Sequence, residues 1–149
     1  MTHNLSPILK QTSDITVDHA KGMYVFDTDG KQYLDFSSGI GVLSTGHCHP
    51  RVVEAAQQQC ASVVHAQYAI MKHQPLLELS SKIADLMPDP IDSVCYSTAG
   101  TEAVETAIRL ARQSTGKPNI IAFRGCFHGR TMGSLSTTTS SAAVRQGVQ

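Results

Sequence analysis

A strand, a turn of small residues, a helix and a second strand follow one another between residues 93 and 123, and this order constrains the fold most. Short apolar runs predict the strands over residues 93–97 and 119–123. The helix between them has one apolar stripe, as a crossover helix on a parallel sheet does. The stripe consists of Val104, Ala107, Ile108 and Ala111. The segment therefore predicts a βαβ unit, and the chain an α/β fold.

A β-hairpin is predicted nearer the amino terminus. Aromatic and β-branched residues are frequent in residues 23–26 and 32–36, and Asp29-Gly30 supplies the turn between them. The glycine-rich residues 37–46 follow, where missing side chains allow unusual backbone angles or close approach of a ligand. We expect this segment to be a functional loop.

Two more helices are predicted, each with a proline in its first turn. Pro50 and Pro75 are followed by apolar residues at helical spacing, so the helices run to about Val63 and Leu86. Serine and threonine dominate residues 134–141, which are predicted to form a polar strand, with a flexible end as the alternative. An open sheet edge and the absence of a capped final element predict an interrupted chain.

Composition excludes several classes of function. Twelve basic and twelve acidic side chains cancel, and neither sign forms a block that could follow a phosphate backbone, so nucleic acid is not an expected partner. The amino terminus lacks the apolar core of a secretory signal, and no stretch is long enough to span a bilayer. The four cysteines form no CxxC pair, which favours reduced thiols in the cytoplasm.

Two loops are candidates for ligand binding. Small residues at 97–103 precede the predicted helix, whose free N–H groups and positive dipole end suit a phosphate. The second predicted strand ends at residues 124–130, and both loops would lie at one rim of a parallel sheet. There Phe127 could face an aromatic ring and Arg130 could grip a carboxylate. The alternatives are a helix start capped by a threonine, a core Phe127, a surface His128 and a solvated Arg130.

Other site types fit less well. The His-Cys-His run at residues 47–49 offers metal ligands, but adjacent residues rarely converge on one ion, so no metal site is predicted. The glycines between residues 39 and 46 depart from the GxGxxG spacing of a dinucleotide loop. A GxSxG nucleophile elbow is absent, which argues against a serine hydrolase.

Three strings, in order, carry a resemblance to a known family. They are GMYVFDTDGKQYLDFSSGIGVLSTGHCHPRVVEA, STAGTEAVETAIRLAR and FHGRT. Together they resemble the class III aminotransferases, which include 4-aminobutyrate, ornithine and acetylornithine aminotransferases. The resemblance implies part of the fold type I large domain, a mainly parallel sheet with helices on both faces. It also implies that residues 1–45, with the hairpin, belong to the small domain and residues 46–149 to an incomplete large cofactor-binding domain.

The resemblance implies pyridoxal 5'-phosphate as the cofactor. Gly100 and Thr101 match the positions that hold its phosphate, Phe127 matches the residue stacked on its ring, and His128 lies beside that residue. For the substrate, Arg130 matches the arginine that grips the α-carboxylate of glutamate or 2-oxoglutarate. The wall of the substrate pocket corresponds to Ile40, although the next residue is glycine where relatives often carry alanine.

The implied function is transfer of an amino group from an ω-amino donor, such as 4-aminobutyrate, to 2-oxoglutarate in a homodimeric enzyme. In the family, the lysine that binds the cofactor corresponds to a position beyond Gln149. No catalytic residue is therefore expected in this sequence, which alone should be inactive. Two alternatives stay open. One is a short non-catalytic protein that binds a phosphate or a partner, and the other is a different reaction of the same cofactor, such as racemisation or a mutase reaction.

Overall fold

The computed structural model describes residues 4–6 and 11–146, which form two compact units. The first unit ends at Met71 and the second begins at Lys72, and each is considered by itself. The division predicted after residue 45 concerns the domains of a larger fold and stays a prediction.

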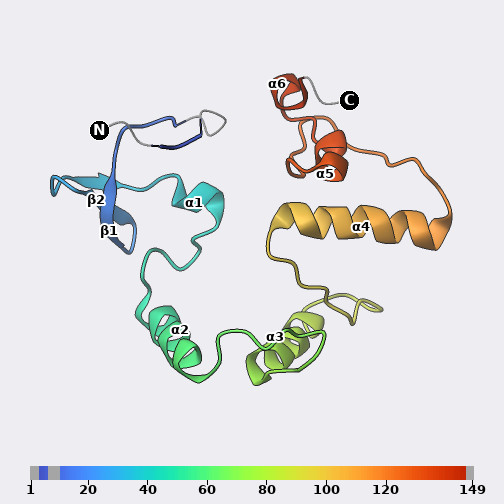
Figure 1. Ribbon diagram of the computed structural model, residues 1–149, viewed down its shortest axis with the longest axis horizontal. Coiled ribbons are helices and arrows are strands. Elements are labelled where there is room, and N and C mark those ends of the chain that lie inside the picture. The colour runs from blue at the N-terminus through green and yellow to red at the C-terminus, as the bar shows by residue number, and fades with distance from the viewer. Residues whose placement is uncertain (1–3, 7–10, 147–149) are drawn as a thin grey trace. The chain divides into compact units, whose positions relative to one another are not determined.

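The first unit contains a three-stranded antiparallel sheet in the order β1-β2-β3 (Figure 1). Its strands are β1 (Val17–Lys21), β2 (Tyr24–Asp27) and β3 (Gln32–Leu34). The predicted hairpin is confirmed by the pairing of β2 with β3, in which Tyr24 lies opposite Leu34. Strand β1, which pairs with β2, was not predicted.

The turn of the hairpin is organised by one carboxylate. Asp27 Oδ1 accepts hydrogen bonds from the backbone N–H groups of Asp29 (3.0 Å) and Lys31 (2.8 Å), and Asp27 Oδ2 accepts one from the Tyr33 hydroxyl (2.8 Å). Gly30 has a φ of 80°, which a residue without a Cβ adopts at no steric cost. The turn chemistry therefore determines where β2 ends and β3 begins.

Two helical segments complete the first unit. The short turn α1 (Ser38–Gly41) lies in the glycine-rich loop and contains left-handed angles at Gly39 (φ 62°) and Ile40 (φ 68°). Helix α2 (Pro50–Ser62) begins at Pro50, as predicted. Its first turn tolerates proline because that N–H has no partner inside the helix.

The second unit consists of four helices within the described residues. They are α3 (Gln74–Ala84), α4 (Gly100–Thr115), α5 (Met132–Thr137) and α6 (Ala142–Arg145). Helices α4 and α5 are in contact, as are α5 and α6 (Figure 1). The bounds of α3 and α4 confirm the helices predicted after Pro75 and Gly100. None of the helices described is long and apolar enough to cross a bilayer.

The sequence predictions for three segments are wrong. Residues 93–97 and 119–123 are not strands, so the part of the chain that the structure describes contains no parallel sheet. A strand requires a neighbouring strand for its backbone N–H and C=O groups, and within the described residues no strand pairs with either segment. Residues 134–141, predicted as a strand, instead include the end of helix α5, whose N-cap residue is Thr131.

Buried side chains gather around α5. Leu135 is the only large apolar residue of the described chain that is buried, and Ser134 and Thr138 beside it are fully buried. By contrast, Phe36, Ile40 and Ile121 are each more than 90% exposed. The packed region of the second unit is thus small, polar and centred where α4 meets α5.

Candidate functional site

The first turn of α4 is shaped by a carboxylate. Ala99 is the N-cap residue and has extended backbone angles (φ −139°, ψ 154°), so the cap is not a threonine. Glu102 Oε2 accepts hydrogen bonds from the backbone N–H groups of Thr98 (2.8 Å) and Ala99 (3.2 Å). Only this half of a capping box forms, because alanine has no side-chain oxygen. The N–H groups of Gly100 and Thr101 have no acceptor inside the helix, and with the helix dipole they suit an anion.

An open cavity of about 590 Å³ lies against this turn. Small-molecule sites are typically about 300–1,000 Å³ in volume. The lining comes from the start of α4 and the loop before α5: Ala99, Gly100, Thr101, Val104, Phe127, His128, Gly129, Arg130 and Thr131. Five of the six predicted site residues are therefore together at one cavity. The sixth, Ile40, belongs to the other unit.

Threonines that follow α5 hold the loop over residues 124–131. The His128 N–H donates to Thr138 Oγ1 (3.0 Å), and the same hydroxyl donates to the Gly129 carbonyl (2.9 Å). The Cys126 N–H donates to Thr139 Oγ1 (3.1 Å), and the Thr139 N–H donates to the Cys126 carbonyl (2.7 Å). The loop is thus fixed by side chains from a segment that sequence reasoning assigned to a strand.

Two side chains of this loop offer complementary contacts to a ligand. Phe127 is 58% exposed and lines the cavity, so it is not a core residue. Arg130 also lines the cavity and makes no ion pair within the described residues. An accessible aromatic face and an unpaired guanidinium are suited to a planar ring and a carboxylate, respectively.

Behind the cavity, three hydroxyls and one carboxylate form a network. The Thr101 hydroxyl lies 2.8 Å from that of Thr131 and 2.7 Å from that of Ser134. Glu105 Oε1 accepts hydrogen bonds from the Thr131 hydroxyl (2.5 Å) and the Ser134 N–H (2.9 Å). These bonds, the one from Thr131 above all, lower the pKa of Glu105 below its ordinary value. Thr131, Ser134 and Glu105 were not predicted as site residues. The one sequence signal for them is Thr131, a threonine before a run of small residues.

Two glycines allow the loop and α5 to lie directly on α4. Gly129 has a φ of 133°, and a Cβ built there would lie 2.6 Å from Ser134 Oγ and closer still to Thr101 Oγ1. A Cβ on Gly133 would overlap the Glu105 carboxylate. Side chains at these positions would therefore push the loop away from the first turn of α4.

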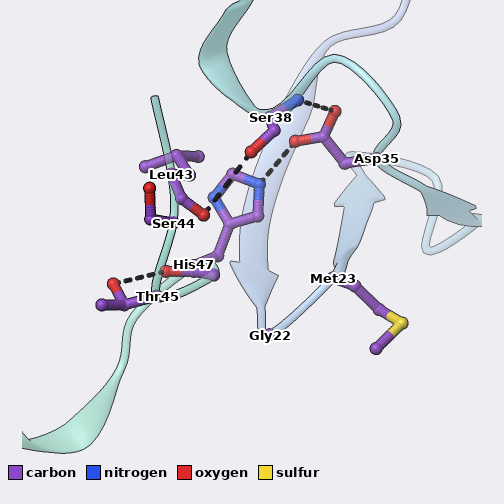
Figure 2. A pocket seen from close by; sticks show the side chains of 9 residues that line it. Gly22, Met23, Asp35, Ser38, Leu43, Ser44, Thr45 and His47 are labelled. Atoms are coloured by element: carbon purple, nitrogen blue, oxygen red, sulfur yellow. Dashed lines mark hydrogen bonds and ion pairs between the residues drawn. The ribbon is translucent and has the colours of Figure 1, made fainter. Parts of the chain in front are cut away.

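A second cavity, of about 370 Å³, lies in the first unit and is organised by Asp35 (Figure 2). Asp35 Oδ1 accepts hydrogen bonds from the backbone N–H groups of Ser37 (2.9 Å) and Ser38 (3.0 Å) and from the Ser37 hydroxyl (2.5 Å). Asp35 Oδ2 lies 2.8 Å from His47 Nε2. Hydrogen bonds from Ser37 and then His47 hold the pKa of Asp35 well below its ordinary value.

These bonds close the base of the loop that carries Ile40. The backbones of His47 and Gly22 exchange two hydrogen bonds (2.9 and 2.7 Å), and a Cβ on Gly46 would lie 2.8 Å from the Gly22 carbonyl oxygen. Ile40 is 93% exposed and has the left-handed φ noted above, which is strained for a β-branched residue. No group of three His, Cys, Asp or Glu side chains in the described part of the chain is arranged to hold a metal ion.

Comparison with known proteins identifies the family. The family described as Aminotransferase class-III matches residues 8–149. The chain belongs to the class III aminotransferases. Curated relatives include the 5-aminovalerate aminotransferase DavT of Pseudomonas putida, 44% identical over 129 residues, and the 4-aminobutyrate aminotransferase GabT of Escherichia coli, 40% identical over 129 residues. Each match covers 86% of this chain and 30% of the relative.

Solved structures show the same relationship. A thermostable (S)-enantioselective ω-transaminase from Thermomicrobium roseum superposes with a TM-score of 0.87 and 31% identity. That match covers 99% of this chain and 35% of the other. The chain therefore has the fold of class III aminotransferases, fold type I, over the part it spans, which is about 30% of the length of its curated relatives.

Proposed function

We propose that this chain is part of a transaminase that uses pyridoxal 5'-phosphate to move an amino group from an ω-amino donor to 2-oxoglutarate. The observation that supports this most is the clustering of Gly100, Thr101, Phe127, His128 and Arg130 around one cavity in a member of a family that uses this cofactor. Because the chain spans about 30% of its relatives, activity and substrates belong to the complete protein.

The residues around the cavity fit the cofactor. The backbone N–H groups of Gly100 and Thr101 suit a phosphate dianion at a helix N-terminus, and Phe127 suits the face of a pyridine ring. Gly129, which has no Cβ, leaves the loop close to the phosphate position. None of the residues that line the cavity is a lysine.

When bound, pyridoxal phosphate supplies an electron sink that stabilises a developing carbanion. The residues of this chain bind and orient the reactants. The first turn of α4 anchors the phosphate, and Phe127 excludes water from one face of the ring. Arg130 binds the α-carboxylate of glutamate or 2-oxoglutarate with two parallel hydrogen bonds.

Similarity to named relatives supports an ω-amino compound as the amino donor. The names of two relatives specify 5-aminovalerate and 4-aminobutyrate, in which the amino group is remote from the carboxylate. We propose 4-aminobutyrate or a similar compound as donor, with Ile40 as part of its pocket. By resemblance, the proposed enzyme is a cytoplasmic homodimer.

Absorbance spectroscopy of the complete protein tests the proposal. Pyridoxal phosphate should give a visible band that 4-aminobutyrate shifts in the absence of an oxo acid, and 2-oxoglutarate should restore it. A shift that 2-oxoglutarate does not reverse would contradict this acceptor, and a shift that no oxo acid reverses would favour another reaction of the cofactor. Failure to bind the cofactor would contradict the proposal entirely and favour a non-catalytic protein.

A further inference from the structure

The direction of the hydroxyl network is set by Glu105. A hydroxyl has one proton to donate, and that of Thr131 is used on Glu105 Oε1. Thr131 Oγ1 is consequently an acceptor toward the hydroxyls of Thr101 (2.8 Å) and Ser134 (2.9 Å). The hydroxyls of Thr101 and Ser134 are 2.7 Å apart, and the Ser134 hydroxyl also lies 3.2 Å from the Thr131 carbonyl oxygen, so all three hydroxyls are joined to one another beside Glu105.

Glu105 also replaces the missing N-cap bond of α5. Thr131 is the N-cap residue of α5, yet its hydroxyl makes no capping bond to that helix. The Ser134 N–H, in the first turn of α5, donates to Glu105 instead (2.9 Å). A carboxylate at this end of a helix is stabilised by the helix dipole. The bonds from Thr131 and Ser134 lower the pKa of Glu105 below its ordinary value, which favours the ionised carboxylate.

The same carboxylate determines the place of the cavity loop. The loop leads directly into Thr131, and its Gly129 lies against the Thr101 and Ser134 hydroxyls. Gly133 lies against Glu105 itself. Since α4 and α5 are joined through these contacts, loss of the carboxylate would release the loop from the first turn of α4.

We infer that Glu105 is a positioning residue for the cofactor subsite. It holds residues 127–131 against α4, beside the backbone N–H groups of Gly100 and Thr101 that would bind the phosphate. This inference rests on the proposed function, and it assigns a task to a residue that does not line the cavity.

Three variants of the complete protein test the inference. They are Glu105→Ala, Glu105→Gln and, as a matched control on α3, Glu78→Ala. Amide hydrogen exchange at Ser134 and Leu135 and the Kd for pyridoxal phosphate are measured for each. Glu105→Ala should accelerate exchange at least tenfold and raise the Kd about tenfold, which corresponds to ~1.4 kcal/mol. Glu105→Gln keeps an acceptor oxygen, so its exchange rate and its Kd should lie between those of the unmodified protein and Glu105→Ala. Glu78→Ala should change neither the exchange rate nor the Kd.

The outcomes separate the two proposals. If the unmodified chain binds the cofactor and Glu105→Ala binds it equally well, the inference is overturned and the proposed function stands. If the complete unmodified protein does not bind it, the proposed function fails and the role of Glu105 falls with it. Should Glu105→Ala unfold, Thr131→Val decides: it should weaken cofactor binding and raise the pKa of Glu105, and no change in either would overturn the inference.

Discussion

Replacing Gly129 by alanine tests the close contact between the cavity loop and α4. The backbone there has a φ of 133°, and holding a residue with a Cβ in such a region costs about 1–3 kcal/mol. The new Cβ would also collide with the hydroxyls of Thr101 and Ser134, and overpacking of this kind costs about 1–3 kcal/mol. We therefore expect the free energy of unfolding to fall by roughly 2–6 kcal/mol.

Gly125→Ala is the matched control in the same loop. Gly125 has a φ of 81°, but a Cβ there would meet no atom within 4 Å. Alanine at this position should therefore lower the free energy of unfolding only through its left-handed backbone angles, by about 1–2 kcal/mol. Urea unfolding followed by circular dichroism measures both variants. If Gly129→Ala destabilised the protein no more than Gly125→Ala, the loop would not lie on α4 as described.

The remaining predictions concern charge and exposed surface. Asp35 has its pKa lowered from 3.8 by hydrogen bonds from Ser37 and His47. Its contribution to stability is thus complete above the unfolded-state pKa and is lost as the pH falls through the folded-state pKa. The stability difference between the unmodified chain and Asp35→Asn should shrink on acidification below about pH 5; a difference that stays constant there in urea titrations would contradict this. Arg130→Ala in the complete protein should raise the KM for glutamate far more than that for an uncharged amine, and equal changes in steady-state assays would remove its assigned role. The exposed apolar side chains predict that the isolated chain binds a hydrophobic fluorescent dye; absence of dye fluorescence would show that they are covered.

Local signals in the sequence predicted those elements that depend on local chemistry. The Asp29-Gly30 turn, with its left-handed glycine, determines the hairpin. Prolines at the starts of α2 and α3 need no partner for a missing N–H, so these helix starts were also predictable. Such features depend on a few neighbouring residues and not on the rest of the fold.

Elements that depend on distant partners were predicted poorly. Residues 93–97 and 119–123 have strand-like composition, but strands form only beside other strands. Conversely, β1 has the unremarkable sequence VDHAK and becomes a strand through its pairing with β2. The register of a sheet is a property of two segments, and one segment alone does not contain it.

The cavity also combines features that depend on neighbouring residues with features that depend on distant partners. The helix start at Gly100 and the FHGRT string were both candidate ligand loops, and the structure brings them together. The network that fixes them was not predicted, because Glu105 and Thr131 are 26 residues apart and common residue types. Ordinary serine and threonine side chains acquire a role only once α5 packs on α4.

We propose that the first turn of α4 holds the phosphate of pyridoxal phosphate. Titration of the isotope-labelled chain with the cofactor, followed by amide NMR spectra, tests it directly, and inorganic phosphate serves as a second probe. We expect the amide signals of Gly100 and Thr101 to shift most with both probes, and those of residues 127–131 also to shift with the cofactor. Cofactor binding that leaves the Gly100 and Thr101 signals unchanged would contradict it.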